Sequence, residues 1–533
     1  MKRLGALPTL CGFAATCTIL LVTSCGGSDE QPFDLLIRGG TVIDGTGGPR
    51  STADVAVRDG RIAAVGDLAG ARARADLDAT GKIVAPGFWD QHAHVVDLEG
   101  HETAENFVRQ GITTIIGSLH SQEQVRDLDE YRARVRMIPN VGLFAGHNWI
   151  REQVLGLEAR APNEEELEQM RVLVARAMEQ GALGLATGLE YTPGVYADTD
   201  EIVELAKVAA AYGGVYVTHM RDEGVRVMES IEETLDVARR ANIPAQINHL
   251  KVTGAAHFGQ SEEMLARLEA AWDAGLEVAF DVYPYTAFST YSDLMFPAWA
   301  LAEGPEAYAR RVGDPATRKR LVDEMIVRFT QQAGQGPESI LFREVPGRAA
   351  WTGRTMADVL EERGLAPNVA NAVDLMIELQ LEGRFIGTFF GMSEHDVERF
   401  LAHPRAMFET DGDLVAFGEG FPHPRSYGSL PRILGRYVRE RGVLTLEDAV
   451  HRMTGMAADW WGDPERGLVR EGAIADLVIF DAERVADRSE YLDPHQFPEG
   501  IEQVLVAGVL VFDGQQVGGV RPGRFLERRR GDH

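Results

Sequence analysis

The chain has 533 residues, of which 45% are hydrophobic and 25% are charged. This composition is typical of a folded protein with one large domain and room for a smaller one, and it excludes a chain that is disordered throughout. The formal net charge of −28 arises from 53 basic and 81 acidic residues. Such an acidic chain disfavours a nucleic-acid partner, because the phosphates would be repelled.

The amino terminus has the features of a targeting segment. Lys2 and Arg3 precede an apolar run at residues 11–22, which is too short for a stable transmembrane helix. We therefore expect residues 1–24 to be a signal peptide that is removed. The mature protein is then exported.

The end of this segment resembles a bacterial lipobox, in the order Val22-Thr23-Ser24-Cys25. Cleavage before Cys25 would leave a lipid anchor on that cysteine at the cell envelope, and residues 25–32 would form a flexible tether. An ordinary secretory signal with a chance cysteine is the alternative. Cys11 and Cys17 are lost with the signal in both cases, so the mature chain contains neither a disulfide nor a buried cysteine ligand.

Both ends of the mature chain contain short β-rich runs separated by glycine turns. They lie at residues 34–38, 41–44, 53–57, 61–66, 475–480 and 504–511. We expect residues 33–85 and 464–526 to pair into one small β-sandwich domain.

Residues 86–463 alternate between short β-rich runs and helical stretches, which predicts an α/β fold of the (β/α)8 TIM-barrel type. The β-rich runs lie at 83–94, 112–120, 141–147, 183–191, 215–221, 244–251, 276–285 and 406–413. Helical periodicity is plainest at 164–179, 199–212, 225–241 and 260–274. The stretch at about 290–403 is an insertion that requires additional helices.

Histidines end several of these runs, where such a barrel places its catalytic groups. His92 and His94 are two residues apart on one strand, so both imidazoles face the same side. One histidine is weak evidence, but six of the 14 fall at strand ends, together with one aspartate. The set is His92, His94, His120, His147, His219, His249 and Asp411. Imidazoles with a carboxylate suit Zn²⁺ or a similar divalent ion.

The chain resembles the amidohydrolase superfamily and, within it, the N-acyl-D-amino-acid deacylase (D-aminoacylase) family, from about residue 33 to 526. The resemblance rests on ordered motifs along nearly the whole mature chain. They are GTVIDGT at 40–46, DGRIAAVG at 59–66, the His92/His94 pair, LGLATGL at 183–189, THMRDEG at 218–224, DVYPY at 281–285, HPR at 423–425 and GAIADLV at 472–478.

This resemblance implies hydrolysis of an amide that links an acyl group to an amino acid with a free carboxylate. Asp411 corresponds to the family's strand-eight aspartate, the general base and acid, and a plain metal ligand or turn residue is its other role. Lys251 and Tyr283 correspond to family positions that are expected to hold the substrate carboxylate, and Tyr191 is a further candidate for this role. A solvated surface lysine and simple aromatic packing are the alternatives for Lys251 and Tyr191.

Residues 147–148 and 423–425 are expected to line the pocket rim, with a structural role as the alternative. His120 departs from the family, which places a cysteine or an aspartate there. Neutral imidazole does not bridge two metals as an anion does, so we expect His120, His219 and His249 to hold one zinc. His92, His94 and Asp411 would then form a weaker second site or a shell around the water, and Glu190 is an alternative bridging anion.

Three readings of function stay open. The first is deacylation of N-acyl-D-amino acids with one or two zinc ions per chain. The second is a dipeptidase or a cyclic-amide hydrolase on the same scaffold. The third is a surface lipoprotein whose catalytic site has decayed and that only binds a ligand.

Overall fold

The computed structural model describes residues 32–95, 98–118, 127–332 and 336–528. The chain divides into two units, Met1–Pro32 and Phe33–His533, and all elements named here belong to the second. Within these described ranges, no helix combines the length and the apolar character that a membrane span requires. His120 and the signal segment lie outside the described residues.

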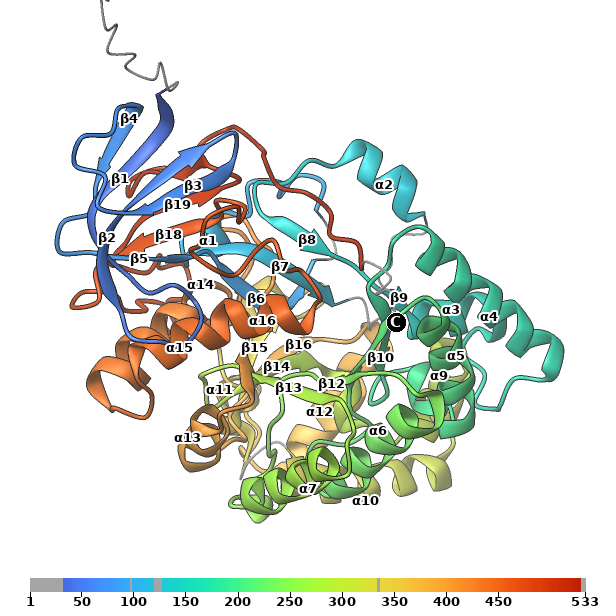
Figure 1. The fold of residues 1–533 in the computed structure, drawn as a ribbon. Helices are drawn as coiled ribbons and strands as arrows, with labels where there is room; N and C mark the ends of the chain where they lie inside the picture. The colour runs from blue at the N-terminus through green and yellow to red at the C-terminus, as the bar shows by residue number, and fades with distance from the viewer. Residues whose placement is uncertain (1–31, 96–97, 119–126, 333–335, 529–533) are drawn as a thin grey trace, which may run out of the picture. The chain divides into compact units, whose positions relative to one another are not determined.

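One eight-stranded sheet unites the two ends of the chain. β5 pairs antiparallel with β18, which places Ile83 opposite Phe480, and Figure 1 shows the blue strands of the amino-terminal region beside the orange and red strands of the carboxyl-terminal region. Strands from the two ends of the chain therefore belong to one sheet. The strands are β1 (Phe33–Val42), β2 (Ser51–Arg58), β3 (Arg61–Gly66), β4 (Ala73–Asp78), β5 (Ile83–Pro86), β18 (Leu477–Phe480), β19 (Ile501–Val506) and β20 (Val509–Phe512).

Nine short parallel strands form two further sheets, in the orders β6-β7-β8 and β17-β13-β12-β11-β10-β9. Each predicted β-rich run contains at least one strand, and the strands are almost entirely buried, as expected of parallel strands covered on both faces. They are β6 (Phe88–His94), β7 (Ile112–Ser118), β8 (Asn140–Gly142), β9 (Ala145–Gly146), β10 (Gly184–Gly188), β11 (Val215–His219), β12 (Ala245–Ile247), β13 (Val278–Val282) and β17 (Ala406–Phe408).

Backbone hydrogen bonds connect β6 to the segment that follows β17. The His94 N–H donates to the Gly412 carbonyl at 2.8 Å, and the Asp411 N–H donates to the His92 carbonyl at 2.9 Å. At the other edge, two residues separate β8 from β9, so the chain passes directly from one sheet to the other. These links bring the carboxyl ends of the first and the last parallel strands together.

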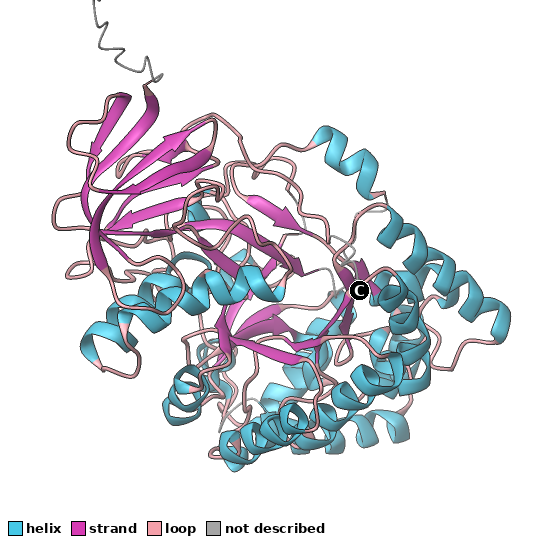
Figure 2. Cartoon of the chain, viewed as in Figure 1, coloured by secondary structure: helices cyan, strands magenta, loops and turns pink. Residues whose placement is uncertain are grey.

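Helices cover the outer side of the parallel strands (Figure 2). The predicted helices at 164–179, 199–212, 225–241 and 260–274 are found within two residues of their expected ends as α4 (Glu164–Glu179), α5 (Thr199–Ala211), α6 (Val227–Ala241) and α7 (Ser261–Asp273). The others here are α1 (Glu105–Val108), α2 (Leu128–Arg134), α3 (His147–Leu155), α14 (Arg425–Arg432), η6 (Ile433–Glu440), α15 (Leu446–Met453) and α16 (Gly455–Trp460), with short turns η1 (Gly194–Tyr196) and η2 (Ala255–His257).

The insertion before β17 contains a three-stranded antiparallel sheet as well as the expected helices. Its strands are β14 (Phe288–Tyr291), β15 (Ile340–Glu344) and β16 (Ile386–Phe389), in the order β14-β16-β15. The insertion contains the additional helices that the sequence predicts, and its three strands are not identified from the sequence because four- and five-residue strands between helices carry too little periodicity to be recognised. Its helices and turns are η3 (Ser292–Met295), α8 (Ala298–Leu301), α9 (Pro305–Gly313), α10 (Pro315–Gln332), η4 (Pro337–Ser339), η5 (Ala349–Trp351), α11 (Met356–Glu362), α12 (Val369–Glu382) and α13 (Glu394–Ala402).

Candidate metal centre

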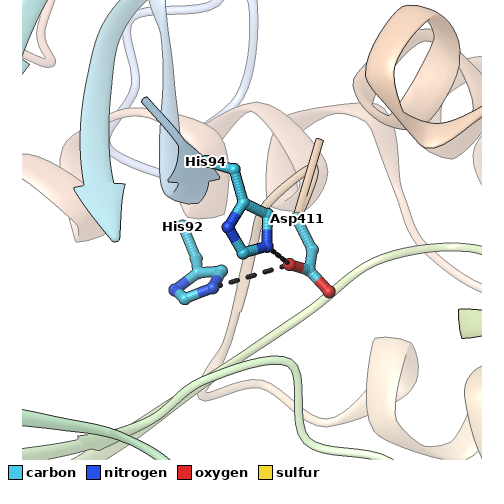
Figure 3. A group of neighbouring side chains, drawn as sticks. All are labelled: His92, His94 and Asp411. Carbon is cyan, nitrogen blue, oxygen red and sulfur yellow. Dashed lines mark hydrogen bonds and ion pairs between the residues drawn. The ribbon is translucent and has the colours of Figure 1, made fainter. Parts of the chain in front are cut away.

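Two histidines of β6 converge on the carboxylate of Asp411 (Figure 3). The Asp411 Oδ1 atom lies 2.9 Å from Nε2 of His94 and 3.6 Å from Nε2 of His92. The Arg425 guanidinium donates from Nη1 to Asp411 Oδ2 at 2.6 Å. The two-residue spacing on the strand therefore brings both imidazoles to one acceptor, as the sequence predicts.

The electrostatic environment keeps Asp411 ionised. Burial alone would raise its pKa, but the charge of Arg425 and the hydrogen bond from His94 hold the pKa of this carboxyl well below its usual range. The pKa of His92 is well below its ordinary value, mainly because burial disfavours the imidazolium. Burial also opposes protonation of His94, but the Asp411 carboxylate outweighs it and raises the pKa of that imidazole.

A second group of three buried side chains consists of His219, His249 and Glu223. The Nδ1 atom of His219 lies 3.0 Å from Nε2 of His249, and Oε1 of Glu223 lies 3.0 Å from Nδ1 of His249. Burial is the main cause that lowers the pKa of His219 to about 4 and the pKa of His249 well below its ordinary value. Both imidazoles are therefore neutral at neutral pH.

The donor sets of the two groups fit a divalent metal ion. Within each group, one ligand atom per residue lies within 4.8 Å of the others. The groups are adjacent, because the ring centroids of His92 and His249 are 5.0 Å apart. Neutral imidazoles with an ionised carboxylate are the ligands that zinc takes in catalytic sites.

Two residues of the centre have left-handed backbone conformations, His249 with a φ of 40° and Asp411 with a φ of 46°. Such conformations cost free energy in non-glycine residues and persist only where the surroundings hold them. The backbone N–H of His249 donates to the buried Asp281 carboxylate, and that of Asp411 donates to His92. These hydrogen bonds therefore hold the backbone of both residues in its left-handed conformation.

Lys251 is only 3% exposed, so the surface-lysine alternative is wrong. Its ammonium lies 2.8 Å from both Glu223 oxygens and 2.7 Å from Nδ1 of His249. Thirteen residues line the pocket at this position. They are His94, Glu190, Tyr191, His219, Glu223, His249, Lys251, Thr253, Phe288, Ser289, Thr290, Leu294 and Asp411.

The two tyrosines expected to hold substrate occupy different surroundings. The Tyr191 hydroxyl lies 2.8 Å from Oγ1 of Thr290, and both residues line the pocket. The Tyr283 hydroxyl donates to the Met392 sulfur at 3.5 Å, and the ammonium of Lys251 lies 5.7 Å from the centre of the Tyr283 ring. Tyr283 is therefore beside Lys251, and only Tyr191 reaches the pocket lining.

His147 does not lie at a pocket rim. It begins α3, is fully buried, and lies 2.8 Å from Oε1 of Glu201, which also accepts from Arg151. His423 and Arg425 are likewise buried. The surroundings of His147 favour the structural alternative, because its ring joins a buried cluster with Glu201 and Arg151.

Sequence reasoning missed two roles near the metal centre. Glu223 lies in the THMRDEG motif, but its place beside His219 and His249 depends on the fold of the β11 loop. Arg425 was expected at the rim, and it instead pairs with Asp411 inside the site. The position of Arg425 two residues after His423 indicates a carboxylate partner, but only the fold identifies that partner as Asp411.

Comparison with known proteins places the chain in a family. The model of the "Amidohydrolase family" matches residues 77–512. D-aminoacylase of Alcaligenes xylosoxydans xylosoxydans is 36% identical over 528 residues, which cover 94% of this chain and 99% of that enzyme. N-acyl-D-glutamate deacylase of the same organism is also 36% identical, over 94% of this chain and 97% of that enzyme. The chain belongs to the amidohydrolase family.

Solved structures of amidohydrolases agree with this assignment. The crystal structure of D-aminoacylase has a TM-score of 0.79 at 34% identity, and covers 93% of this chain and 100% of its own. The N-acyl-D-glutamate deacylase of Bordetella bronchiseptica, complexed with zinc and a phosphonate inhibitor, has a TM-score of 0.79 at 33% identity with the same coverage. The predicted resemblance is confirmed, and the scaffold is of the TIM-barrel type with an additional domain.

The first prediction concerns metal affinity. Joint replacement of His219 and His249 by alanine is expected to lower the affinity for the most tightly bound zinc ion by more than about 100-fold, since two direct ligands are lost. The H92A/H94A double variant should retain that ion. Zinc affinity is measured by competition with a chelator, and His395→Ala on the surface of α13 is the matched control. Unchanged zinc affinity in H219A/H249A would contradict the assignment.

Proposed function

We propose that the chain is a metal-dependent deacylase of N-acyl-D-amino acids. The observation that carries the proposal is the convergence of His92 and His94 on an ionised Asp411, beside the His219 and His249 pair. The named activities of full-length relatives at 36% identity support the same reaction. We assign one or two zinc ions to His92, His94, His120, His219, His249 and Asp411.

The metal, when bound, polarises the amide carbonyl and lowers the pKa of the attacking water. Asp411 provides the proton transfers. Its carboxylate is ionised in this environment, so it accepts a proton from the water and passes it to the leaving amine. Arg425 and His94 orient the two carboxylate oxygens through hydrogen bonds of 2.6 and 2.9 Å.

We assign the substrate carboxylate to Lys251, with Tyr283 and Tyr191 as companions. Lys251 presents a buried ammonium at the pocket, where a charge-assisted hydrogen bond to a small anion is strong. Glu223 holds that ammonium in place from the other side. This arrangement favours an acyl amino acid with a free carboxylate over a cyclic amide.

We further propose that the eight strand positions close into a (β/α)8 barrel over residues 86–463 and that residues 33–85 and 464–526 form a β-sandwich. The hydrogen bonds between β6 and the segment after β17 support the closure. The lipobox-like sequence supports removal of residues 1–24 and an exported protein that is held at the cell envelope through a lipid on Cys25.

The second prediction tests the reaction. N-acetyl-D-amino acids are expected to be hydrolysed faster than their L-enantiomers, dipeptides and hydantoins, in an assay of the released amine or of ring opening. Treatment with a chelator should abolish turnover and Zn²⁺ should restore it. Faster turnover of dipeptides or hydantoins would favour the second reading of function. No turnover of any member of the panel in the zinc-loaded protein would support a decayed, ligand-binding protein instead.

The third prediction concerns proton transfer. Asp411→Asn is expected to lower kcat by about 10²–10⁴-fold, the usual contribution of a positioned acid or base. Asp413→Asn is the matched control, because Asp413 lies two residues away and pairs with Arg343. Steady-state kinetics on the preferred N-acetyl-D-amino acid measure both variants. A kcat within tenfold of the native value for D411N would rule out this role.

The fourth prediction concerns the substrate carboxylate. Lys251→Ala is expected to lower kcat/KM for an N-acetyl-D-amino acid by about 10–100-fold, because a charged hydrogen bond contributes about 1.5–3 kcal/mol. The effect should be much smaller for the corresponding N-acetyl-D-amino-acid amide, which lacks the carboxylate. Lys207→Ala, at a half-exposed position on α5, is the control. Equal losses on both substrates would show that Lys251 acts on the fold or the metal, not on the carboxylate.

The fifth prediction concerns the envelope. The native chain expressed in a bacterium that processes lipoproteins should fractionate with membranes and incorporate labelled palmitate. Cys25→Ala should do neither, while Cys17→Ala should behave as the native chain does. Palmitate labelling of C25A would contradict a lipid anchor at this position.

A further inference from the structure

The two ring nitrogens of His219 have different neighbours. Nδ1 lies 3.0 Å from Nε2 of His249, and Nε2 lies 3.0 Å from Oε2 of Glu190. The two nitrogens of an imidazole point away from each other, so Glu190 lies on the side of the ring opposite His249. The side chains of His219 and Glu190 are both 6% exposed, so bulk water does not replace this contact.

His249 turns one nitrogen to His219 and the other to a buried ion pair. Its Nε2 faces His219, and its Nδ1 lies 3.0 Å from Oε1 of Glu223 and 2.7 Å from the ammonium of Lys251. The Glu223 carboxylate accepts from Lys251 with both oxygens, at 2.8 Å each. In each histidine, therefore, one nitrogen faces the other histidine and the second nitrogen faces different buried side chains.

A neutral imidazole carries one N–H, and a carboxylate accepts a hydrogen bond only from that N–H. For His219 and His249 to bind one metal ion through the nitrogens that face each other, Nδ1 of His219 must offer its lone pair, and the N–H of that ring is then on Nε2. This N–H points at Oε2 of Glu190, which lies 3.0 Å away. We propose that Glu190 is a positioning residue that fixes His219 in the tautomer and orientation that bind the metal. This inference rests on the proposed metal-dependent function.

The geometry argues against Glu190 as a bridging anion, the alternative expected from the sequence. A bridging carboxylate would lie on the side of His219 that faces His249. Glu190 instead contacts the opposite nitrogen, and neither group of clustered ligand atoms in the described residues includes it. Carboxylates that hold metal-binding histidines orient the ring and increase its basicity, and their loss costs about 10–100-fold in metal affinity.

The chain contains a matched pair away from the metal centre. His147 Nε2 lies 2.8 Å from Oε1 of Glu201, and both side chains are buried, but neither belongs to a group of clustered ligand atoms in the described residues. Glu201→Gln therefore changes a buried carboxylate–histidine pair of the same chemistry without touching the candidate metal ligands. Glu233→Gln, which affects an ion pair with Arg221, is a second control if E201Q does not fold.

The experiment measures zinc affinity in the H92A/H94A background, where only the His219 and His249 site remains to be titrated. Competition with a chromogenic chelator should show about 10–100-fold weaker zinc binding for Glu190→Gln, and a larger loss for Glu190→Leu, which retains no acceptor. E201Q or E233Q should stay within twofold. The visible absorption spectrum of the Co²⁺-loaded protein should shift in E190Q and not in the controls.

A second measurement separates positioning from bridging. Without the H92A/H94A changes, E190Q should bind the same number of zinc ions as the native chain at saturating zinc. Loss of one ion at saturation, or zinc affinity of E190Q and E190L within twofold of their parent, would overturn the proposal. If the native chain binds no zinc, the proposed function itself is wrong. This outcome can be distinguished from the two results that would overturn the role of Glu190 alone.

Discussion

The rest of the centre depends on the hydrogen bonds that Arg425 and His94 make to the carboxylate of Asp411. Asp411 is 5% exposed, yet it stays ionised because Arg425 and His94 donate hydrogen bonds to its two oxygens. A buried carboxylate without such partners would be neutral, and a neutral carboxyl does not accept a proton. Its backbone N–H also bonds to His92, so the same residue connects the last parallel strand to the first. Catalytic geometry and strand pairing are therefore fixed together.

Asp411 stays charged in spite of burial, whereas burial makes three of the histidines neutral. Desolvation lowers the pKa of His92, His219 and His249, so these rings offer lone pairs and not positive charges at neutral pH. A metal ion is the partner that such a group of neutral donors takes. The same burial would be unfavourable for Lys251, but Glu223 compensates its ammonium with two hydrogen bonds. Each buried charge in the pocket is thus matched to a specific partner.

The sequence predicted the scaffold well because strand and helix periodicity is local. All eight β-rich runs contain strands, and α4 begins and ends at the predicted residues. The His92, His94 and Asp411 group was also predictable, since a two-residue spacing and the shared end of parallel strands bring such residues together. The short strands of the insertion were not predictable, because four residues carry almost no periodic signal.

Side-chain contacts between residues that are far apart in the chain could not be predicted from the sequence. Glu223 contacts Lys251 and His249 across 28 and 26 positions of the chain, and Glu201 contacts His147 across 54. The contacts of Glu223 depend on how the loops after β11 and β12 fold, and the contact of Glu201 depends on how α5 lies beside the start of α3. His147 directly follows β9, but the chain turns there into α3 and carries the ring into a buried ion-paired cluster. A histidine at a strand end is therefore a candidate metal ligand, and the side chains that surround its ring in the fold decide whether it has this role.

The central claim is that His219 and His249 bind a metal through the two nitrogens that face each other, with Asp411 beside them. Anomalous X-ray diffraction at the zinc edge, on crystals of the zinc-loaded protein, tests it most directly. The account predicts a peak within bonding distance of Nδ1 of His219 and Nε2 of His249, with Glu190 still bonded to Nε2 of His219. A peak that contacts neither nitrogen, or one bound to Glu190 in place of His219, would contradict it.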